Sequence, residues 1–158
     1  MPSLMPGMPG TKEAYGISVI NADQSVNIPP KAFVRYGLRD NGIVLLTSTH
    51  KGEGGFAILN RDKAYRSVFK STIDRIQSLD TAIWIRDRAY ALTNLVDKKV
   101  VLNDHLLITF NLKVGARLMV VKSTTVAMSF TPVEIWKKKF EDRGMIEAVK
   151  NMSKLEIF

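Results

Sequence analysis

One stretch of this chain occurs twice, and this internal repeat is the strongest constraint on its fold. The first copy runs over Gly16–Leu46 and the second over Ala89–Val121. Four apolar positions recur at a constant offset of 74 residues (100 − 26 = 74): Val26, Ile28, Tyr36 and Leu38 correspond to Val100, Leu102, Phe110 and Leu112. Gly42 corresponds to Gly115 after the loss of one residue from the turn. Such self-similarity indicates two copies of one structural unit.

Local signals predict the same order of elements in each copy: strand, short turn, strand, about one helical turn, then a glycine turn and a hairpin. In the first copy Pro29-Pro30 ends the second strand and opens a helix, because proline lacks the amide hydrogen that a strand ladder needs. Lys31–Tyr36 forms this helix, with Gly37 as its cap. In the second copy Asn103–Phe110 takes the helical position and Asn111 the position of Gly37, since asparagine tolerates a left-handed backbone.

A longer helix is predicted between the two copies. Asn60 suits an N-cap. Arg61–Gln77 follows with apolar residues at helical spacing, which places Val68 and Ile73 on the buried side. Thr81–Ile85 then alternates as a strand does.

Two further helices are predicted after the second copy. Thr131–Glu134 has the sequence of a capping box with proline at the first helical position, so a helix should begin near Pro132 and end near Arg143. Met145–Met152 is the second helix. Leu155–Phe158 is short and apolar, and we expect an edge strand or a docked tail. Each copy is thus followed by a helix.

Composition narrows the class of protein. The chain has 158 residues, 46% of them hydrophobic, which fits a packed core in one domain or two small ones. Cysteine is absent, which excludes disulfides and thiolate chemistry and fits the cytoplasm. Apolar runs fall short of the roughly 18 residues of a membrane helix, so we expect no membrane association. The formal net charge of +8 favours a polyanionic partner.

One segment carries a family resemblance. Ser25–Leu46, SVNIPPKAFVRYGLRDNGIVLL, has an apolar strand, an Ile-Pro step, a short helix ending in apolar-Gly-apolar, and a glycine turn before an apolar strand. It resembles the AbrB/SpoVT/MazE-type swapped-hairpin β-barrel family of DNA-binding transition-state regulators and antitoxins. The second copy has the same pattern, with Asn103 in place of Pro29. Since such families interleave the hairpins of two protomers, the two copies here should interlock within one chain. The alternative is a homodimer in which each copy pairs with its counterpart.

The resemblance implies an α+β fold, mainly β with helices, in which the two repeats form one pseudo-two-fold β-barrel. The expected organisation is a disordered tail over 1–13, repeat 1 over 14–59, a connecting helix and strand over 60–88, repeat 2 over 89–130, and C-terminal helices and tail over 131–158.

The resemblance also implies that basic residues on the barrel turns and short helix contact duplex DNA. Lysine would neutralise phosphates, and arginine could also bind guanine edges. The candidate DNA-binding residues are Lys31, Arg35, Arg39, Lys98, Lys99, Lys113 and Arg117. A second basic face on the connecting helix comprises Lys63, Arg66 and Lys70.

The sequence departs from this family at two places. Val19 and Ser25 stand roughly where such regulators often carry arginines. The short helix of the second copy, Asp104–Thr109, has neither lysine nor arginine. Half of the DNA-binding face should therefore have lost its contacts, or should instead cover an apolar partner surface.

Nothing in the sequence indicates an enzyme. The two histidines, His50 and His105, do not correspond in the repeat and lack a metal-ligand spacing, so we expect no catalytic site, metal or cofactor. The glycine-rich segment 50–55 lacks the spacing of a phosphate-binding loop and reads as a hairpin loop.

A DNA-binding transcriptional regulator is therefore the leading hypothesis. The main alternative is a protein-interaction module, antitoxin-like or a scaffold, that has lost DNA contacts. Antitoxins of this type usually add a disordered acidic tail, whereas 136–158 is basic to mixed. A sensor of a small ligand is a third reading that no residue specifically supports.

Overall fold

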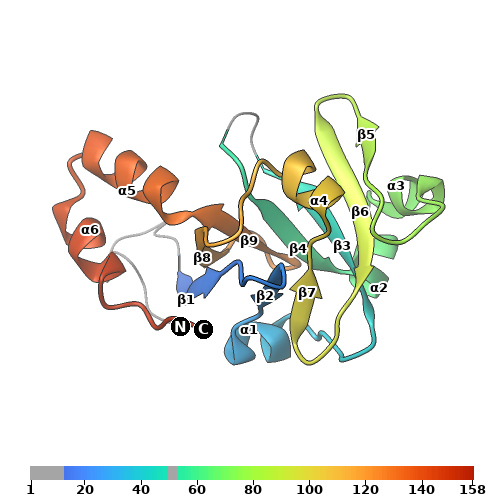
Figure 1. Ribbon diagram of the computed structural model, residues 1–158, viewed down its shortest axis with the longest axis horizontal. Helices are drawn as coiled ribbons and strands as arrows, with labels where there is room; N and C mark the ends of the chain where they lie inside the picture. Colours follow the sequence, from blue (N-terminus) through green and yellow to red (C-terminus); the bar gives the residue numbers. More distant parts are fainter. Residues whose placement is uncertain (1–12, 50–52) are drawn as a thin grey trace.

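The computed structural model describes residues 13–49 and 53–158 of the chain. Figure 1 shows their arrangement. Residues 1–12 of the tail predicted over 1–13 and the loop residues His50, Lys51 and Gly52 lie outside the described residues. Glu13, the last residue of that predicted tail, accepts from the Lys122 amide at 3.0 Å. Repeat 1 forms β1 (Ala14–Val19), β2 (Ser25–Asn27), α1 (Pro30–Arg35), β3 (Ile43–Ser48) and β4 (Phe56–Asn60). Repeat 2 forms β6 (Arg88–Asn94), β7 (Lys99–Val101), α4 (Asp104–Thr109), β8 (Arg117–Lys122) and β9 (Ala127–Pro132).

The remaining elements follow each repeat. The segment between the repeats forms α2 (Arg61–Tyr65), α3 (Lys70–Arg75) and β5 (Ile83–Ile85), and the C-terminal segment forms α5 (Val133–Asp142) and α6 (Ile146–Met152). The pairings between named strands are all antiparallel, so the expected α+β class is confirmed. None of the helices within the described residues is long and apolar enough to cross a membrane.

The strands of the two repeats are interleaved. The larger sheet has the order β1-β8-β9-β4-β3-β6-β5, and β2 pairs with β7 in a separate two-stranded sheet. Repeat 1 thus gives β1 to the β8–β9 hairpin, and repeat 2 gives β6 to the β3–β4 hairpin. Exchanging each strand for its equivalent in the other repeat (β1 for β6, β3 for β8 and β4 for β9) gives the same order from β1 to β6, read from the opposite end. The two copies therefore pair with each other within one chain.

The larger sheet is open in its main-chain hydrogen bonding. Within the described residues its order ends at β1 on one side and at β5 on the other. The closed β-barrel that the resemblance implies therefore stays a prediction.

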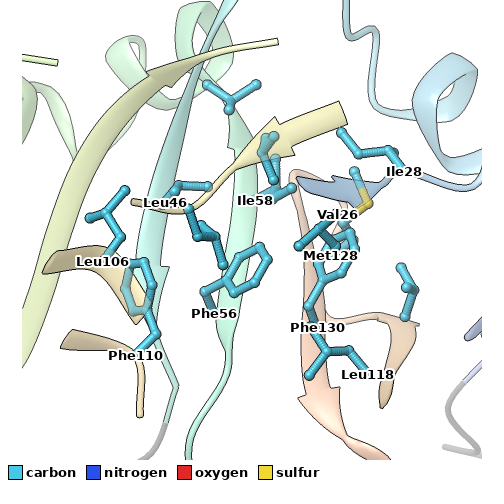
Figure 2. Close-up of a cluster of buried hydrophobic side chains, with 14 of the residues drawn as sticks. Val26, Ile28, Leu46, Phe56, Ile58, Leu106, Phe110, Leu118, Met128 and Phe130 are labelled. Carbon is cyan, nitrogen blue, oxygen red and sulfur yellow. The ribbon is translucent and has the colours of Figure 1, made fainter. Parts of the chain in front are cut away.

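The main core lies between the larger sheet and the layer of β2, β7, α1 and α4. The eight apolar residues that define the repeat are all at most 7% exposed, so the positions that correspond in sequence are also buried alike in the structure. Phe56 stacks on Phe130 with ring centroids 4.9 Å apart and lies 5.6 Å from the ring of Phe110. Figure 2 shows side chains from both repeats converging on this cluster.

Two helix pairs cover the opposite face of the larger sheet. α2 and α3 pack over β3, β4 and β6 in a cluster that includes Leu45, Leu59 and Ile73. α5 and α6 pack over β8 and the start of β1 in a second cluster that includes Met119 and Phe140. The two pairs lie at opposite ends of the molecule in Figure 1.

The C-terminal tail adds to the β1 edge. The Ile17 amide donates to the Glu156 carbonyl at 2.8 Å, and the Phe158 amide donates to the Ile17 carbonyl at 2.8 Å. Ile17 and Ile157 form an isolated parallel bridge. The prediction of an edge strand or docked tail is thereby confirmed.

The single helix predicted over Arg61–Gln77 is wrong, because the chain forms two short helices there. The Ala64 carbonyl would accept from the Val68 amide in a continuous helix. Instead it accepts from the Ser67 amide at 3.0 Å and from the Ser67 hydroxyl at 2.6 Å. Serine competes in this way for backbone groups and favours turns. Val68, expected on the buried side, is 87% exposed.

The capping box predicted at Thr131–Glu134 is also wrong, whereas the caps predicted at Asn60, Gly37 and Asn111 are confirmed. Thr131 continues β9 opposite Met119, and Pro132 occupies the N-cap of α5 without a side-chain cap bond. By contrast, the Asn60 side chain accepts from the Asp62 and Lys63 amides as expected. Gly37 and Asn111 both have positive φ, at 65° and 54°, directly after the C-caps of α1 and α4.

Candidate nucleic-acid interface

The short helix of repeat 1 presents two basic side chains to solvent. Lys31 and Arg35 are four residues apart, so they lie on one side of α1, and both are exposed. α1 is held to the core from its other side by the buried residues Ala32 and Tyr36. Burial raises the pKa of Tyr36 well above its ordinary value, and the neighbouring Tyr15 hydroxyl adds to this shift.

A turn from repeat 2 lies against α1. The Ile28 amide donates to the Lys98 carbonyl at 2.9 Å, and the Lys98 amide donates to the Asp40 carboxylate at 2.7 Å. The Lys98 ammonium sits 5.7 Å from the centroid of the Phe33 ring. The interleaving of the repeats thus places Lys98 beside α1, on the side of Phe33 rather than on the side of Lys31 and Arg35. We call Lys31, Arg35, Arg39 and Lys98 the α1 basic surface.

Through Arg39, this surface continues into a concavity between the turn after α1 and α2. The concavity has a volume of about 550 Å³ and is lined by Arg39, Lys63 and Arg66 among others. The predicted second basic face is therefore divided. Lys63 and Arg66 adjoin Arg39, whereas Lys70 lies outside the concavity with its ammonium 5.6 Å from the centroid of the Tyr65 ring.

The equivalent surface of repeat 2 is contacted by another segment of the same chain. His105 and Thr109 stand where repeat 1 has Lys31 and Arg35, 74 positions earlier (105 − 31 = 74). His105 Nε2 accepts from the Ala82 amide at 3.0 Å. Asn103 Nδ2 donates to the Asp80 carbonyl at 2.9 Å. Residues 80–82, which lead into β5, therefore dock by polar contacts on the helix that lacks basic residues.

The turn next to α4 is acidic rather than basic. Gln24 Nε2 donates to the Asp104 carboxylate at 2.9 Å, so the turn between β1 and β2 lies against α4. Hydrogen bonds from the Ser25 hydroxyl at 2.6 Å and the Ser25 amide at 3.1 Å lower the pKa of Asp23. Lys99 contributes to the same shift, so its charge lies near Asp23.

Lys113 and Arg117 lie apart from the α1 basic surface. They belong to the turn before β8 and to its first residue, and both are exposed. This turn is bound to the end of β1, where the Gly115 amide donates to the Ile20 carbonyl at 2.7 Å. Arg117 pairs with Val19 across the ladder. The seven predicted residues therefore form separate groups, and only four of them form the α1 basic surface.

Other predicted features have structural explanations. Gly54 and Gly55 are buried, and the Gly55 amide donates to the Phe110 carbonyl at 2.9 Å, which is a packing role. Across residues 13–49 and 53–158, no group of three or more metal-ligating side chains comes together. Comparison with protein-family models, with curated proteins and with solved structures gave no match.

Proposed function

We propose that this protein is a DNA-binding transcriptional regulator of the AbrB/SpoVT type that binds duplex DNA through the α1 basic surface. The interleaved strands of the two repeats support the proposal, because hairpins of two protomers are interleaved in that family. Within this proposal the two repeats form a pseudo-two-fold swapped-hairpin barrel, and one chain takes the role of a dimer.

The observation that carries the proposal is the meeting of Lys98 with α1. Lys98 comes from the other repeat, yet its ammonium lies over Phe33 of α1, the helix that carries Lys31 and Arg35, and its amide binds Asp40, the neighbour of Arg39. Asp40, a carboxylate that binds this turn, accepts a backbone hydrogen bond from Lys98. The lysines neutralise backbone phosphates, and the arginines can bind a phosphate or a guanine edge through two hydrogen bonds.

The difference between the two repeats also bears on how much of the duplex this protein would contact. Because α4 has no basic residue, residues 80–82 bind to it and the adjacent turn is acidic, the contacts come mainly from one half of the molecule. A symmetric dimer of such units reads two half-sites. We propose that this chain binds one half-site and therefore needs no palindrome.

Paired variants test this surface. Replacing Lys31 and Lys98 with glutamine should weaken binding to a labelled duplex by about tenfold or more at near-physiological salt, since two phosphate contacts are lost. Lys137→Gln with Lys138→Gln removes the same charge from exposed positions of α5 and serves as the control. Equal losses of affinity in both pairs, measured by fluorescence anisotropy, would rule out the α1 basic surface as the binding site.

One observation favours the alternative of a protein-interaction module. Trp84 is 57% exposed on β5, which forms one edge of the larger sheet. Beside it lies a cavity of about 390 Å³ that Arg86 and Phe110 also line. An edge strand with an exposed aromatic residue suits an added strand from a partner. Co-purification of a stoichiometric protein that Trp84→Ala loses would support this function, and its absence would leave DNA binding as the better proposal.

A further inference from the structure

The concavity between the turn after α1 and α2 carries an excess of positive charge. Its lining includes four cationic side chains, Arg39, Arg61, Lys63 and Arg66, and one carboxylate, Asp62, which gives a formal net charge of +3 (4 − 1 = 3). Three of the cations are exposed, and Arg61 is partly exposed. Like charges around one hollow repel each other, and a bound anion would relieve that repulsion.

Most of these cations have no acidic partner among the described residues. Asp62 is paired with Arg61 at 3.5 Å, and the Arg61 guanidinium also lies 5.5 Å from the centroid of the Tyr65 ring. For Arg39, Lys63 and Arg66, no carboxylate of residues 13–49 or 53–158 lies within ion-pair distance. Three charged donors are therefore available to a ligand.

The walls of the concavity are fixed by a single side chain. Asn60 Oδ1 accepts from the Asp62 and Lys63 amides at 3.0 and 3.2 Å, and Nδ2 donates to the Tyr36 and Gly37 carbonyls at 3.1 and 2.9 Å. This amide thereby ties the start of α2 to the end of α1. The backbone segments that carry the donors are thereby held together without a ligand, which lowers the cost of binding one.

Lys63 reaches across from α2 to the α1 side. Its ammonium lies 3.5 Å from the point where a Cβ at Gly37 would stand. On the same side, the Gly42 amide closes the turn by donating to the Arg39 carbonyl at 3.0 Å. Charges from α2 and from the turn after α1 are therefore directed to one hollow.

The lining of the hollow differs from the corresponding residues of repeat 2. In repeat 2 the helix after the hairpin begins beyond Pro132, whose side chain forms no cap bond. The residue three positions after this N-cap is Ile135, where repeat 1 has Lys63. The charged concavity is therefore not a necessary product of the repeat.

We propose that this concavity is a binding site for a phosphate group. Two guanidinium groups and one ammonium match the tetrahedral oxygens of phosphate, which accept several charge-assisted hydrogen bonds at once. At about 550 Å³ the hollow is larger than a lone phosphate, so the group would be part of a larger molecule. Its source is either the backbone of a duplex bound at the adjoining α1 basic surface or a small phosphorylated ligand. Only the first source rests on the proposed function.

The test compares two double variants of the full-length protein. Lys63→Gln with Arg66→Gln removes two cations from the hollow. Lys70→Gln with Arg75→Gln removes one lysine and one arginine from α3, outside the hollow, and is the matched control. Melting temperatures are measured with inorganic phosphate or pyrophosphate, against chloride at constant ionic strength. We expect both anions to raise the midpoint of the wild type and the control, and the hollow variant to lose at least about tenfold in apparent affinity.

A second arm distinguishes the two sources. Duplex affinity is measured against salt concentration for the same proteins. If the duplex backbone supplies the phosphate, the log–log slope of the hollow variant falls in magnitude by about 0.9 per lost contact, and the control keeps the slope of the wild type. Anion stabilisation with an unchanged slope assigns a small phosphorylated ligand.

The outcomes separate this inference from the proposed function. In one outcome the wild type binds no duplex, but phosphate stabilises the wild type and the control and does not stabilise the hollow variant. This outcome would refute the DNA-binding proposal and support the phosphate site. If phosphate and pyrophosphate stabilise neither the wild type nor the control, and the hollow variant and its control have equal salt slopes, the phosphate site is refuted.

Discussion

At the residue scale, single side chains decide how the repeats are joined and how their surfaces differ. Asn60 was predicted from sequence as a helix cap, and it is one, but its second role needs the fold. Its amide group also binds the carbonyls that end α1, which lie 24 and 23 residues earlier. Residue preference reveals the local bond, because the cap and its partners are neighbours in sequence. It does not reveal the distant one.

Asn60→Ala should lower the free energy of unfolding by about 1–3 kcal/mol, from the lost cap and the lost donors to Tyr36 and Gly37. Asn60→Ser keeps a cap acceptor and should lose less. Urea unfolding followed by circular dichroism measures both. An Asn60→Ser variant as stable as the wild type would show that the bonds to α1 contribute nothing, and equal losses for the two variants would show that the cap contributes nothing.

The Asp23 carboxylate offers a test of the acidic turn between β1 and β2, which lies against α4. Ser25→Ala removes the hydroxyl that contributes most to lowering the pKa of Asp23 from its ordinary value of 3.8, so this pKa should rise. A lowered pKa in the folded state stabilises the fold above the unfolded pKa, and this contribution is lost as pH falls through the folded pKa. A carboxyl-carbon NMR titration gives the midpoint, and an unchanged midpoint in the variant would contradict the assigned cause.

At the element scale, the sequence located the repeats well and the connections between them poorly. The strands, short helices and caps of each copy follow from local signals that occur twice. The break between α2 and α3 was missed because Ser67 competes for one carbonyl within an otherwise helical pattern. The absence of basic residues from 104–109 was visible in the sequence. The contact of residues 80–82 with α4 is a tertiary contact, which the hydrophobic periodicity of the sequence does not predict.

Weakening this contact should loosen β5 selectively. Asn103→Asp keeps an acceptor for the Leu106 amide but removes the donor to the Asp80 carbonyl. Hydrogen exchange should therefore become faster in residues 80–85, whereas the amides of α4 keep their protection. Mass spectrometry of the exchanged peptides measures both. Faster exchange throughout α4 would mean that the variant had damaged the helix itself.

At the scale of the whole molecule, the interleaved pairing makes each repeat depend on the other. β1 and β6 each lie on the hairpin of the opposite repeat, and β2 and β7 pair only across the repeats. Half of the chain would leave sheet edges unpaired and part of the main core uncovered. The repeat and the resemblance together predicted this interlocking, although the main-chain pairing of the described residues leaves the sheet open.

Separated halves should therefore fail to fold as monomers. Fragments 1–88 and 89–158 are expected to be unfolded or self-associated alone, and to regain the native circular dichroism spectrum when mixed. The intact chain should be monomeric and unfold in one transition. Size-exclusion chromatography with light scattering measures the masses. A stable, folded monomer of either fragment would contradict the dependence between repeats.

The measurement that tests the central claim most directly is the affinity for a generic labelled duplex over a range of salt concentrations, followed by fluorescence anisotropy. Binding through the α1 basic surface and its adjoining hollow predicts a linear decrease on a log–log plot, with a slope of roughly −3 to −6 for about four to six neutralised phosphates. Affinity that is absent at low salt, or that does not change with salt, would contradict the account of this protein as a phosphate-contacting DNA-binding regulator.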